Sequence, residues 1–368
     1  MCKAARSGAT RFETVARRAD DLAAILYTSG TTGNPKGVVY SHRSIFLHSM
    51  GSIGVDAFAI SHRDRILMVP PMFHANAWGT PFSGWLAGSD FVLPGPHLQP
   101  DRLAKVIALT QPSFTSAVPT ILNDLLQLHA KAPLDLSSFR VIVSGGSAVS
   151  PALIKRVRDA WGIDVIQGWG MTETSPMCVL SFPPRDAGPE EALIWQAKSG
   201  RPVAGMEVRI VDDADQPLAE DGQTIGHLQL RGPWVTAGYH LQSEGDGSLS
   251  PDGWLRTGDA GTIDTLGYVQ ITDRTKDLIK SGGEWISSVD LENDISRFPG
   301  VAEVAVIAVP DDRWEERPLA ILSTVSGEAP DFKAVRAFLA SQIAKFMIPE
   351  YWASVEGLPK TSVGKIDK

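Results

Sequence analysis

A loop rich in glycine and hydroxyl side chains is the segment of this sequence best suited to chemistry. Directly after Thr28 the chain reads Ser29-Gly30-Thr31-Thr32-Gly33-Asn34-Pro35-Lys36-Gly37. Glycines allow backbone N–H groups to approach an anion closely, and hydroxyls with an ammonium group supply further donors. A solvated turn has little use for so many hydroxyls beside a lysine. The composition therefore favours a loop that binds phosphate groups.

This loop differs from the Walker phosphate loop. The Walker pattern needs four residues between its first glycine and a Gly-Lys pair, followed by Ser or Thr. Here Pro35 precedes Lys36 and Gly37 follows it. We therefore expect triphosphate binding of another type.

The longer segment Tyr27–Val39, YTSGTTGNPKGVV, resembles the phosphate-loop signature of the adenylate-forming superfamily, which includes acyl-CoA synthetases, luciferases and peptide-synthetase adenylation domains. Four later segments resemble the family's other signatures in the same order, namely Gly168–Thr174, Trp254–Asp259, Asp273–Glu284 and Pro359–Lys368. The resemblance implies that ATP is bound by Thr28, Ser29, Gly30, Thr31, Thr32, Gly33, Lys36, Gly168, Trp169, Gly170, Met171, Asp259 and Arg274.

The resemblance also implies individual roles in the nucleotide site. Trp169 would stack on the adenine in place of the more usual Tyr, and it keeps a π-face. Thr172 would contact the α-phosphate and Glu173 would hold Mg²⁺, which together stabilise the charge that develops on phosphoryl transfer. Asp259 would accept both ribose hydroxyls, a task that suits an acceptor-only carboxylate. Arg274 would reach the ribose or the phosphates.

The C-terminal signatures imply a hinge and a second catalytic step. Lys276 would be the pivot about which a C-terminal domain swings. Lys280, Gly282 and Gly283 would face the active site only in the thioester-forming orientation. Lys365 would bridge the acid carboxylate and the α-phosphate, offsetting negative charge as two anions come together. Without the resemblance, these residues read as a charged surface strand and a solvated terminus.

The segment VPPMFHANAW, which ends at Trp78, resembles the sequence beside the acyl tunnel of fatty acyl-CoA synthetases. His74 would lie beside the acyl carboxylate, and Trp78 resembles a gate residue of long-chain members. Pro71 departs from the family's pattern at this point. Gly145 and Gly146 would form the opposite wall, where small residues leave room for a lipid-like acid.

The resemblance implies a fatty acid–CoA ligase that uses ATP, Mg²⁺ and the co-substrate CoA. A carboxylic acid would form an acyl-adenylate, and CoA would then take the acyl group. One alternative is an acyl-AMP ligase that loads a carrier protein. Because the family normally carries a long segment before the phosphate loop, a truncated, non-catalytic nucleotide-binding remnant is a second alternative.

Hydrophobic patterns indicate the elements that must position these residues. Buried strands are expected at Leu22–Thr28, Ile66–Val69, Phe114–Ala117, Arg140–Ser144 and Asp164–Gln167, and helices at Ser41–Ser52, Leu103–Leu109, Pro119–Ala130 and Pro151–Trp161. This alternation predicts parallel α/β units. Later short strands between turn residues predict an antiparallel layer, at Glu207–Asp212, Gly226–Arg231, Gly261–Asp264 and Tyr268–Ile271. A last α/β set is expected at Val289–Ser296, Val301–Val309, Leu319–Val325 and Phe332–Ile343.

We therefore expect an α/β protein with the adenylate-forming fold. It would have a large N-terminal α/β domain, lacking its first part and carrying a small antiparallel β layer, and a small mobile α+β C-terminal domain. The predicted bounds are 1–272 for the incomplete N-terminal domain, with its α/β part at 22–200 and its β-rich part at 201–272. A hinge follows at 273–276 and the C-terminal AMP-binding domain at 277–368.

Composition excludes several other classes of protein. The 368 residues carry a net charge of −8, which disfavours nucleic-acid binding because phosphate contacts need clustered Lys and Arg. Cys2 and Cys178 cannot form a disulfide framework, which fits a reducing cytoplasm. The sequence has no apolar run long enough for a spanning helix. Contact with a membrane surface and a homodimer both stay open.

Overall fold

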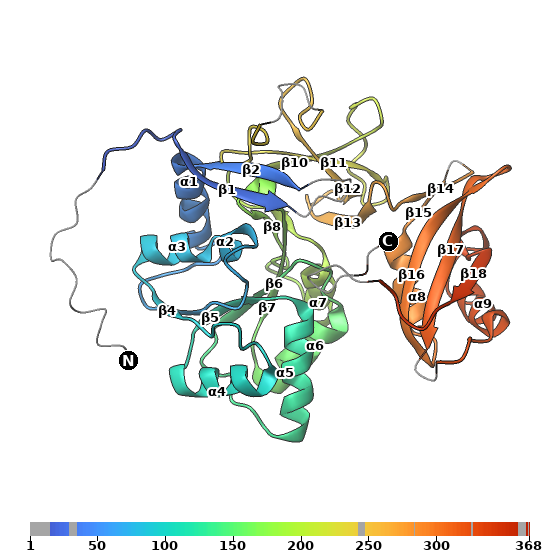
Figure 1. The fold of residues 1–368 in the computed structure, drawn as a ribbon, viewed down its shortest axis with the longest axis horizontal. Coiled ribbons are helices and arrows are strands. Elements are labelled where there is room, and N and C mark those ends of the chain that lie inside the picture. The colour runs from blue at the N-terminus through green and yellow to red at the C-terminus, as the bar shows by residue number, and fades with distance from the viewer. Residues whose placement is uncertain are drawn as a thin grey trace.

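The computed structural model describes residues 15–28, 35–241, 247–282, 284–324 and 327–359, together with residues 366 and 368. A sheet of seven strands forms the centre of its N-terminal part (Figure 1). The spatial order is β4-β3-β5-β6-β7-β8-β9, and the strands from β4 to β7 run parallel. These strands are β3 (Arg65–Leu67), β4 (Asp90–Val92), β5 (Phe114–Ala117), β6 (Val141–Ser144), β7 (Val165–Gly170), β8 (Met177–Leu180) and β9 (Arg201–Pro202).

Helices connect the parallel strands and cover one face of the sheet (Figure 1). They are α4 (Pro100–Thr110), α5 (Pro119–Lys131) and α6 (Pro151–Trp161), with α7 (Pro189–Ala197) beside α6. All four begin with proline, whose fixed φ suits the first helical turn. The predicted helices at 103–109, 119–130 and 151–161 are therefore confirmed.

The sheet is buried on both faces, as a parallel sheet between layers must be. Successive residues of a strand point to opposite faces. In β6, Val141 and Val143 belong to one hydrophobic core, which includes Leu230 of the antiparallel sheet. Ile142 belongs to the other core, which includes Leu122 of α5.

The first predicted strand is present but does not join the parallel sheet. β1 (Leu22–Thr28) pairs antiparallel with β2 (Lys36–Ser41) in a separate hairpin. Only a short loop separates the two strands, and neighbours in sequence with such a connection pair with each other. Helix α1 (His42–Ile53) follows, and the Ser41 hydroxyl caps it by accepting a hydrogen bond from the Ser44 amide at 3.1 Å.

The predicted antiparallel layer is a four-stranded sheet with its strands in chain order. It contains β10 (Glu207–Val211), β11 (Gly226–Arg231), β12 (Leu255–Ile263) and β13 (Val269–Arg274). Strand β12 begins earlier than expected because it pairs with β11 on one side and β13 on the other. Its extension carries Asp259 into the sheet.

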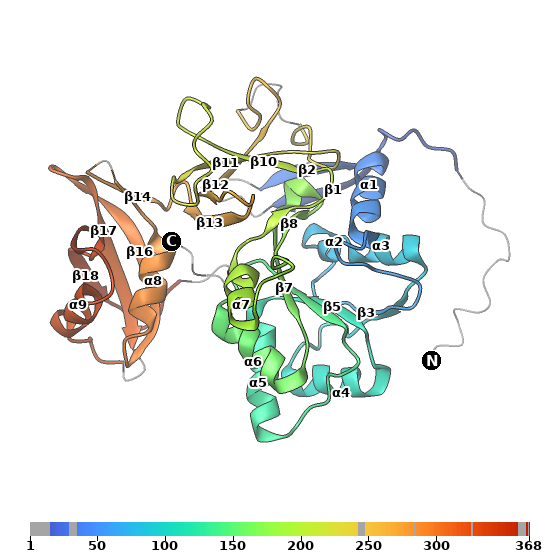
Figure 2. The same cartoon turned by 180° about the vertical axis from the view of Figure 1, so that it is seen from behind.

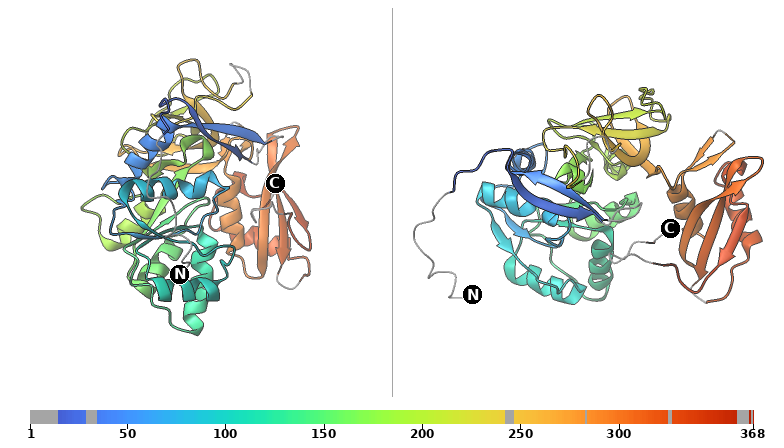
Figure 3. Two further views of the ribbon diagram at one scale, coloured as in Figure 1. Left: turned by 60° about the vertical axis from the view of Figure 1, so that its left-hand side comes forward. Right: turned by 45° about the horizontal axis from the view of Figure 1, so that its top comes forward.

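The C-terminal part has its own five-stranded sheet and core, and it lies beside the antiparallel sheet (Figures 1 and 2). It contains β14 (Ile279–Ser281), β15 (Glu284–Ile286), α8 (Ser288–Ser296), β16 (Val301–Asp311), β17 (Glu315–Thr324), α9 (Phe332–Ala340), the 3-10 helix η3 (Lys345–Met347) and β18 (Tyr351–Ser354). The right-hand view of Figure 3 shows it set apart from helices α4 to α6. The division into domains and hinge at fixed residues stays a prediction.

Several short elements were not expected from the sequence, among them α2 (Ala75–Trp78), α3 (Thr80–Ala87) and strands β4, β8, β9, β14, β15 and β18. Each of these strands has only two to four residues, too few to show an alternating pattern. Among the described residues, none of the helices has the length and apolar character needed to cross a bilayer.

A buried carboxylate fastens three strands of the parallel sheet at their amino ends. Asp64 is 4% exposed and accepts hydrogen bonds from the Ser61 amide, the Ser113 hydroxyl and Arg140 Nε at 2.8, 2.7 and 2.9 Å. Arg140 Nη2 also donates to the Phe58 carbonyl at 2.8 Å. Burial by itself would raise the pKa of Asp64, but the donors from Arg140 and Ser113 outweigh it and hold the pKa below its usual value.

We expect Asp64→Ala to lower the free energy of unfolding by about 3 kcal/mol, because it leaves Arg140 and the other donors without their partner. The stabilisation should be present above pH 3.8, where the unfolded carboxyl is ionised, and lost as pH falls through the lower folded pKa. Urea unfolding would measure both effects. Asp159→Ala is the control, since Asp159 forms an exposed ion pair with Lys155 and its loss should cost under about 1 kcal/mol. Equal effects of the two substitutions would contradict the assignment.

Candidate active site

The predicted phosphate loop is the segment that connects β1 to β2. Thr28 at the end of β1 lies opposite Lys36 at the start of β2, so the hairpin register fixes both ends of the loop. Ser29, Gly30, Thr31, Thr32 and Gly33 lie outside the described residues.

Lys36 lies beside the ring of Tyr239, which was not among the predicted site residues. Its Nζ lies 4.9 Å from the centre of the Tyr239 ring, within the range of a cation–π contact. Backbone contacts bring this ring to the hairpin, since Val38 forms an isolated antiparallel bridge with Tyr239, and the His240 amide donates to the Gly37 carbonyl at 2.7 Å.

The second group of predicted residues lies at the carboxyl end of β7. Gly168, Trp169 and Gly170 are the last residues of that strand, and Met171 precedes the short 3-10 helix η2 (Thr172–Thr174). In α/β sheets the carboxyl ends of parallel strands are where ligands bind. Glycine is required at 170, because a Cβ there would lie 1.7 Å from the Pro176 carbonyl oxygen.

A hydrogen bond and an ion pair connect β7 to the antiparallel sheet. Trp169 Nε1 donates to Asp259 Oδ2 at 3.0 Å, and Arg274 Nε lies 2.9 Å from Asp259 Oδ1. Asp259 is 5% exposed, and its burial raises its pKa, while Arg274 and the indole act in the opposite direction. These three predicted residues, which lie far apart in the sequence, therefore form one connected group.

Glu173 is fixed by a hydrogen bond to one of its two carboxylate oxygens. The Tyr239 hydroxyl donates to Glu173 Oε1 at 2.7 Å, and the Thr236 amide donates to the Glu173 carbonyl at 2.8 Å. Nearby, the Tyr40 hydroxyl donates to the Thr172 carbonyl at 2.6 Å, and burial raises the pKa of Tyr40. Tyr40 and Tyr239 thus position the η2 helix, and neither carries a sequence signal for that role.

The donor set around Glu173 fits magnesium shared with a nucleotide. The described residues contain no group of three or more His, Cys, Asp or Glu side chains that could enclose a metal ion. Mg²⁺ is commonly held by one or two carboxylates together with substrate phosphates and water. Glu173, with Oε2 outside its bond to Tyr239, matches that pattern.

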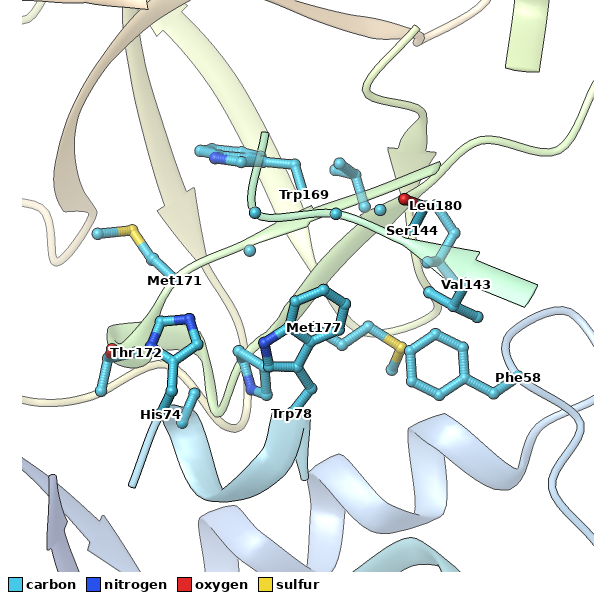
Figure 4. Close-up of a pocket in the computed structure, with 17 residues that line it drawn as sticks. Phe58, His74, Trp78, Val143, Ser144, Trp169, Met171, Thr172, Met177 and Leu180 are labelled. Atoms are coloured by element: carbon cyan, nitrogen blue, oxygen red, sulfur yellow. The ribbon is translucent and has the colours of Figure 1, made fainter. Parts of the chain in front are cut away.

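Nine of the predicted residues line a single apolar pocket, which is drawn in Figure 4. They are His74, Trp78, Gly145, Gly146, Gly168, Trp169, Gly170, Met171 and Thr172. The pocket and its mouth enclose about 580 Å³. The lining also includes the apolar residues Phe58, Val143, Met177, Val179 and Leu180, which were not among the predicted site residues. Their only signal was hydrophobicity, which core residues share.

Glycines at the end of β6 allow the pocket wall to close around Trp78. A Cβ on Gly145 would lie 2.7 Å from the Gly168 carbonyl oxygen, so the two strand ends approach too closely for a side chain. Gly146 has a φ of +79°, a conformation that favours glycine. Cβ positions at both glycines would lie 3.7 Å from the Trp78 ring.

The opposite wall is a left-handed turn. Residues 75–79 all have φ between +45° and +71°, and only the last is glycine. Such a conformation costs a non-glycine residue about 1–2 kcal/mol. Packing holds it, since Ala75 and Ala77 are buried and the Thr80 hydroxyl donates to the Ala77 carbonyl at 2.8 Å. The turn directs His74 and Trp78 into the pocket (Figure 4).

The described residues that were predicted for the hinge and the thioester-forming step lie outside the apolar pocket. Lys280 Nζ lies 3.4 Å from Asp213 Oδ2 and 4.4 Å from the centre of the Trp285 ring, and Lys280 does not line the described pocket. Gly282 has a φ of +62°, and a Cβ there would lie 2.6 Å from the Trp314 ring. Lys276 follows β13 and lies 3.9 Å from Asp277. Gly283 and Lys365 lie outside the described residues.

A buried histidine supports the pocket from behind. His48 of α1 is 1% exposed, and its Nε2 accepts a hydrogen bond from the Met177 amide at 3.2 Å. A Cβ on Gly79 would lie 2.4 Å from the His48 ring, so the left-handed turn packs directly on it. Burial lowers the pKa of His48 to about 3.

The unfolded chain protonates His48 near pH 6.5, whereas the folded chain protonates it only near pH 3. We therefore expect the free energy of unfolding to decrease as the pH is lowered from 6.5 to 3. The slope should be about 1.4 kcal/mol per pH unit, so about 2 kcal/mol is lost between pH 6.5 and 5. His48→Gln keeps an acceptor without titrating and should flatten this slope in chemical unfolding curves. His62→Gln, on an exposed histidine, should leave it unchanged. An unaltered slope in His48→Gln would refute the assignment.

Comparisons with known proteins agree with this geometry. The family model of the AMP-binding enzymes matches residues 3–240, and that of the AMP-binding enzyme C-terminal domain matches residues 290–365. The chain is 44% identical over 93% of its length to a long-chain-fatty-acid–CoA ligase of Thermus thermophilus. It is 45% identical over 94% to a 3-methylmercaptopropionyl-CoA ligase of Ruegeria pomeroyi and 43% identical over 95% to a medium-chain-fatty-acid–CoA ligase of Ectopseudomonas oleovorans. It spans 64% of the length of each.

Solved structures show the same fold. The ATP-bound MatB of Rhodopseudomonas palustris superposes with a TM-score of 0.83 at 30% identity, covering 99% of this chain and 70% of its own. The o-succinylbenzoate CoA synthetase MenE of Bacillus subtilis, in complex with ATP and a magnesium ion, gives 0.84 at 28% identity, covering 98% and 72%. The predicted α/β class and adenylate-forming fold are thus confirmed, and the chain belongs to the AMP-binding enzyme family.

Proposed function

We propose that this protein is an ATP-dependent fatty acid–CoA ligase. The observation that carries the proposal is the apolar pocket lined by His74, Thr172 and Trp169. The Trp169 indole donates to Asp259, which is paired with Arg274, so a buried carboxylate lies directly beside this pocket. The apolar pocket suits an acyl chain, and the buried carboxylate beside it suits the ribose of a nucleotide. The two together therefore suit an acyl-adenylate. The relatives named as CoA ligases support the same reaction.

In the first half-reaction, a carboxylate oxygen of the acid attacks the α-phosphorus of ATP, and pyrophosphate leaves. The Thr172 hydroxyl would donate a hydrogen bond to an α-phosphate oxygen, and Lys36 with the loop 29–34 would hold the departing pyrophosphate. Asp259 would accept the ribose hydroxyls, and Trp169 would lie against the adenine. Lys365 would contact both the carboxylate of the acid and the α-phosphate of ATP. His74 would lie beside the same carboxylate.

Glu173 would hold Mg²⁺, which supplies charge neutralisation on the phosphates when bound. Its contact with Tyr239 leaves the second oxygen, Oε2, to meet the ion. The chain's own contribution is to orient this carboxylate at the end of β7. The magnesium ion bound with ATP in the MenE complex supports this part of the proposal.

In the second half-reaction, the thiol of CoA attacks the acyl carbon, AMP leaves, and the thiol proton passes to solvent. Movement about Lys276 would bring Lys280, Gly282 and Gly283 to the site. Lys280 contacts Asp213 instead in the present arrangement, which fits an orientation other than the thioester-forming one. An acyl-AMP ligase that loads a carrier protein would share the first half-reaction. We place the enzyme in the cytoplasm, where CoA and ATP are found.

A pyrophosphate-release assay tests the proposal. The full chain, ATP, Mg²⁺ and CoA are combined with single fatty acids from butyrate to palmitate, and we expect release that depends on the acid. Replacing CoA with a phosphopantetheinyl carrier protein separates the two acceptors. ATP binding in calorimetry with no turnover of any acid would instead identify a non-catalytic nucleotide-binding protein.

Asp259→Asn should weaken ATP binding by about ten- to a hundredfold, because hydrogen bonds to a charged acceptor contribute about 1.5–3 kcal/mol. The KM for ATP should rise while the KM for the acid stays constant, since Asp259 does not line the described acyl pocket. Asp264→Asn is the matched control, because Asp264 directly follows β12, the strand that carries Asp259, and forms an ion pair with Lys198. Equal changes in both KM values would argue against a ribose contact.

A further inference from the structure

Phe58 separates two hollows in the N-terminal part of the molecule. The first is the apolar pocket that contains His74 and Thr172. The second encloses about 940 Å³ with its mouth and is lined in part by Val141, Ile166 and Arg140. Among the residues that the structure describes, Phe58 is the one that lines both.

The two hollows follow one another along the same face of the central sheet. Val143 of β6 and Gly168 of β7 line the first hollow, and Val141 and Ile166, two residues earlier on the same strands, line the second. Residues two apart on a strand point to the same face and lie roughly 7 Å apart along it. The second hollow therefore continues the first toward the amino ends of β6 and β7.

The Phe58 ring is a fixed wall between them. It is 5% exposed, and its centre lies 5.7 Å from that of Phe114 in a tilted arrangement. Its backbone carbonyl accepts a hydrogen bond from Arg140 Nη2 at 2.8 Å, and Arg140 is held by the buried Asp64. In Figure 4 the ring stands beside Met177, across the pocket from His74 and Thr172.

We propose that Phe58 determines the acyl chain length by closing the tail end of the pocket. The inference rests on the proposed acyl-adenylate function of that pocket. The acyl group would extend from Thr172 between Trp78 and Met177, and its terminal methyl would meet the Phe58 ring. Relatives of nearly equal identity are named for medium-chain, long-chain and 3-methylmercaptopropionyl substrates, so overall similarity does not set the length.

Removal of the ring would join the two hollows into one longer channel. Each methylene that an apolar wall buries strengthens binding about fourfold, the equivalent of about 0.8 kcal/mol. Affinity should therefore rise about fourfold per methylene until the tail reaches Phe58, and then stop rising or fall. In a protein without the ring, the rise should continue to longer tails.

Calorimetry with non-reactive acyl-sulfamoyl adenosines, from butyryl to palmitoyl, tests this inference without requiring turnover. The proteins are the wild-type chain, Phe58→Ala and Phe58→Leu, the last of which keeps an apolar filling if the alanine variant does not fold. Phe182→Ala is the matched control, because Phe182 lines the second hollow but not the first. All variants are compared by thermal unfolding.

We expect the wild-type affinity to stop rising at a medium chain length and Phe58→Ala to extend the rise by at least two methylenes, about sixteenfold for the longer analogue. Phe58→Leu, which removes less of the ring's volume, should extend the rise by less than Phe58→Ala. The sulfamoyl adenosine with a butyryl chain should bind the wild-type chain and Phe182→Ala equally. An unchanged length profile in the Phe58 variants, or the same extension in Phe182→Ala, would overturn the inference. Failure of every analogue to bind would overturn it together with the acyl-pocket assignment. Normal binding of the analogues by a protein that releases no pyrophosphate with any acid would contradict the proposed function but not the role of Phe58.

Discussion

The hydrogen bond between the Trp169 indole and the Asp259 carboxylate connects the two sheets from which the site is built. Trp169 ends the parallel strand β7, and Asp259 lies within the antiparallel strand β12. Burial makes the charged form of Asp259 costly, and Arg274 with the indole compensates for the lost water. The Asp259–Arg274 pair and the apolar pocket are adjacent because this contact joins the two sheets that carry them.

Close backbone approach is the second constraint on the site. The Gly145 and Gly168 segments meet at the carboxyl ends of β6 and β7, where a Cβ would collide with a carbonyl oxygen. The left-handed turn at 75–79 faces them across the pocket and rests on the buried His48. One wall has glycines, and the other has a left-handed backbone turn. Together they leave a narrow apolar space between the Trp78 ring and the sheet.

The parallel sheet extends this space beyond the carboxyl ends of β6 and β7. Because β6 and β7 place alternate residues on one face, a pocket that begins at their carboxyl ends has a natural continuation toward their amino ends. Phe58 interrupts that continuation, and its backbone is fixed by the same Arg140–Asp64 pair that fastens the strands. Stability of the sheet and the proposed limit on acyl length thus depend on one group of contacts.

The sequence indicated the family through its five signature segments, and the resemblance of these and of neighbouring segments to the family also pointed to nine of the residues that line the pocket. It predicted the main helices and strands because strand–helix alternation is a local signal. The separate β1–β2 hairpin and the short strands needed tertiary pairing to form, since three-residue segments carry no periodicity. Only the tertiary structure identified Tyr239, Tyr40 and Phe58, whose roles depend on contacts with residues distant in the chain. The domain bounds, the roles of Lys276 and Lys365 and a homodimer stay predictions, because they concern movement, residues outside the described ranges, or a second chain.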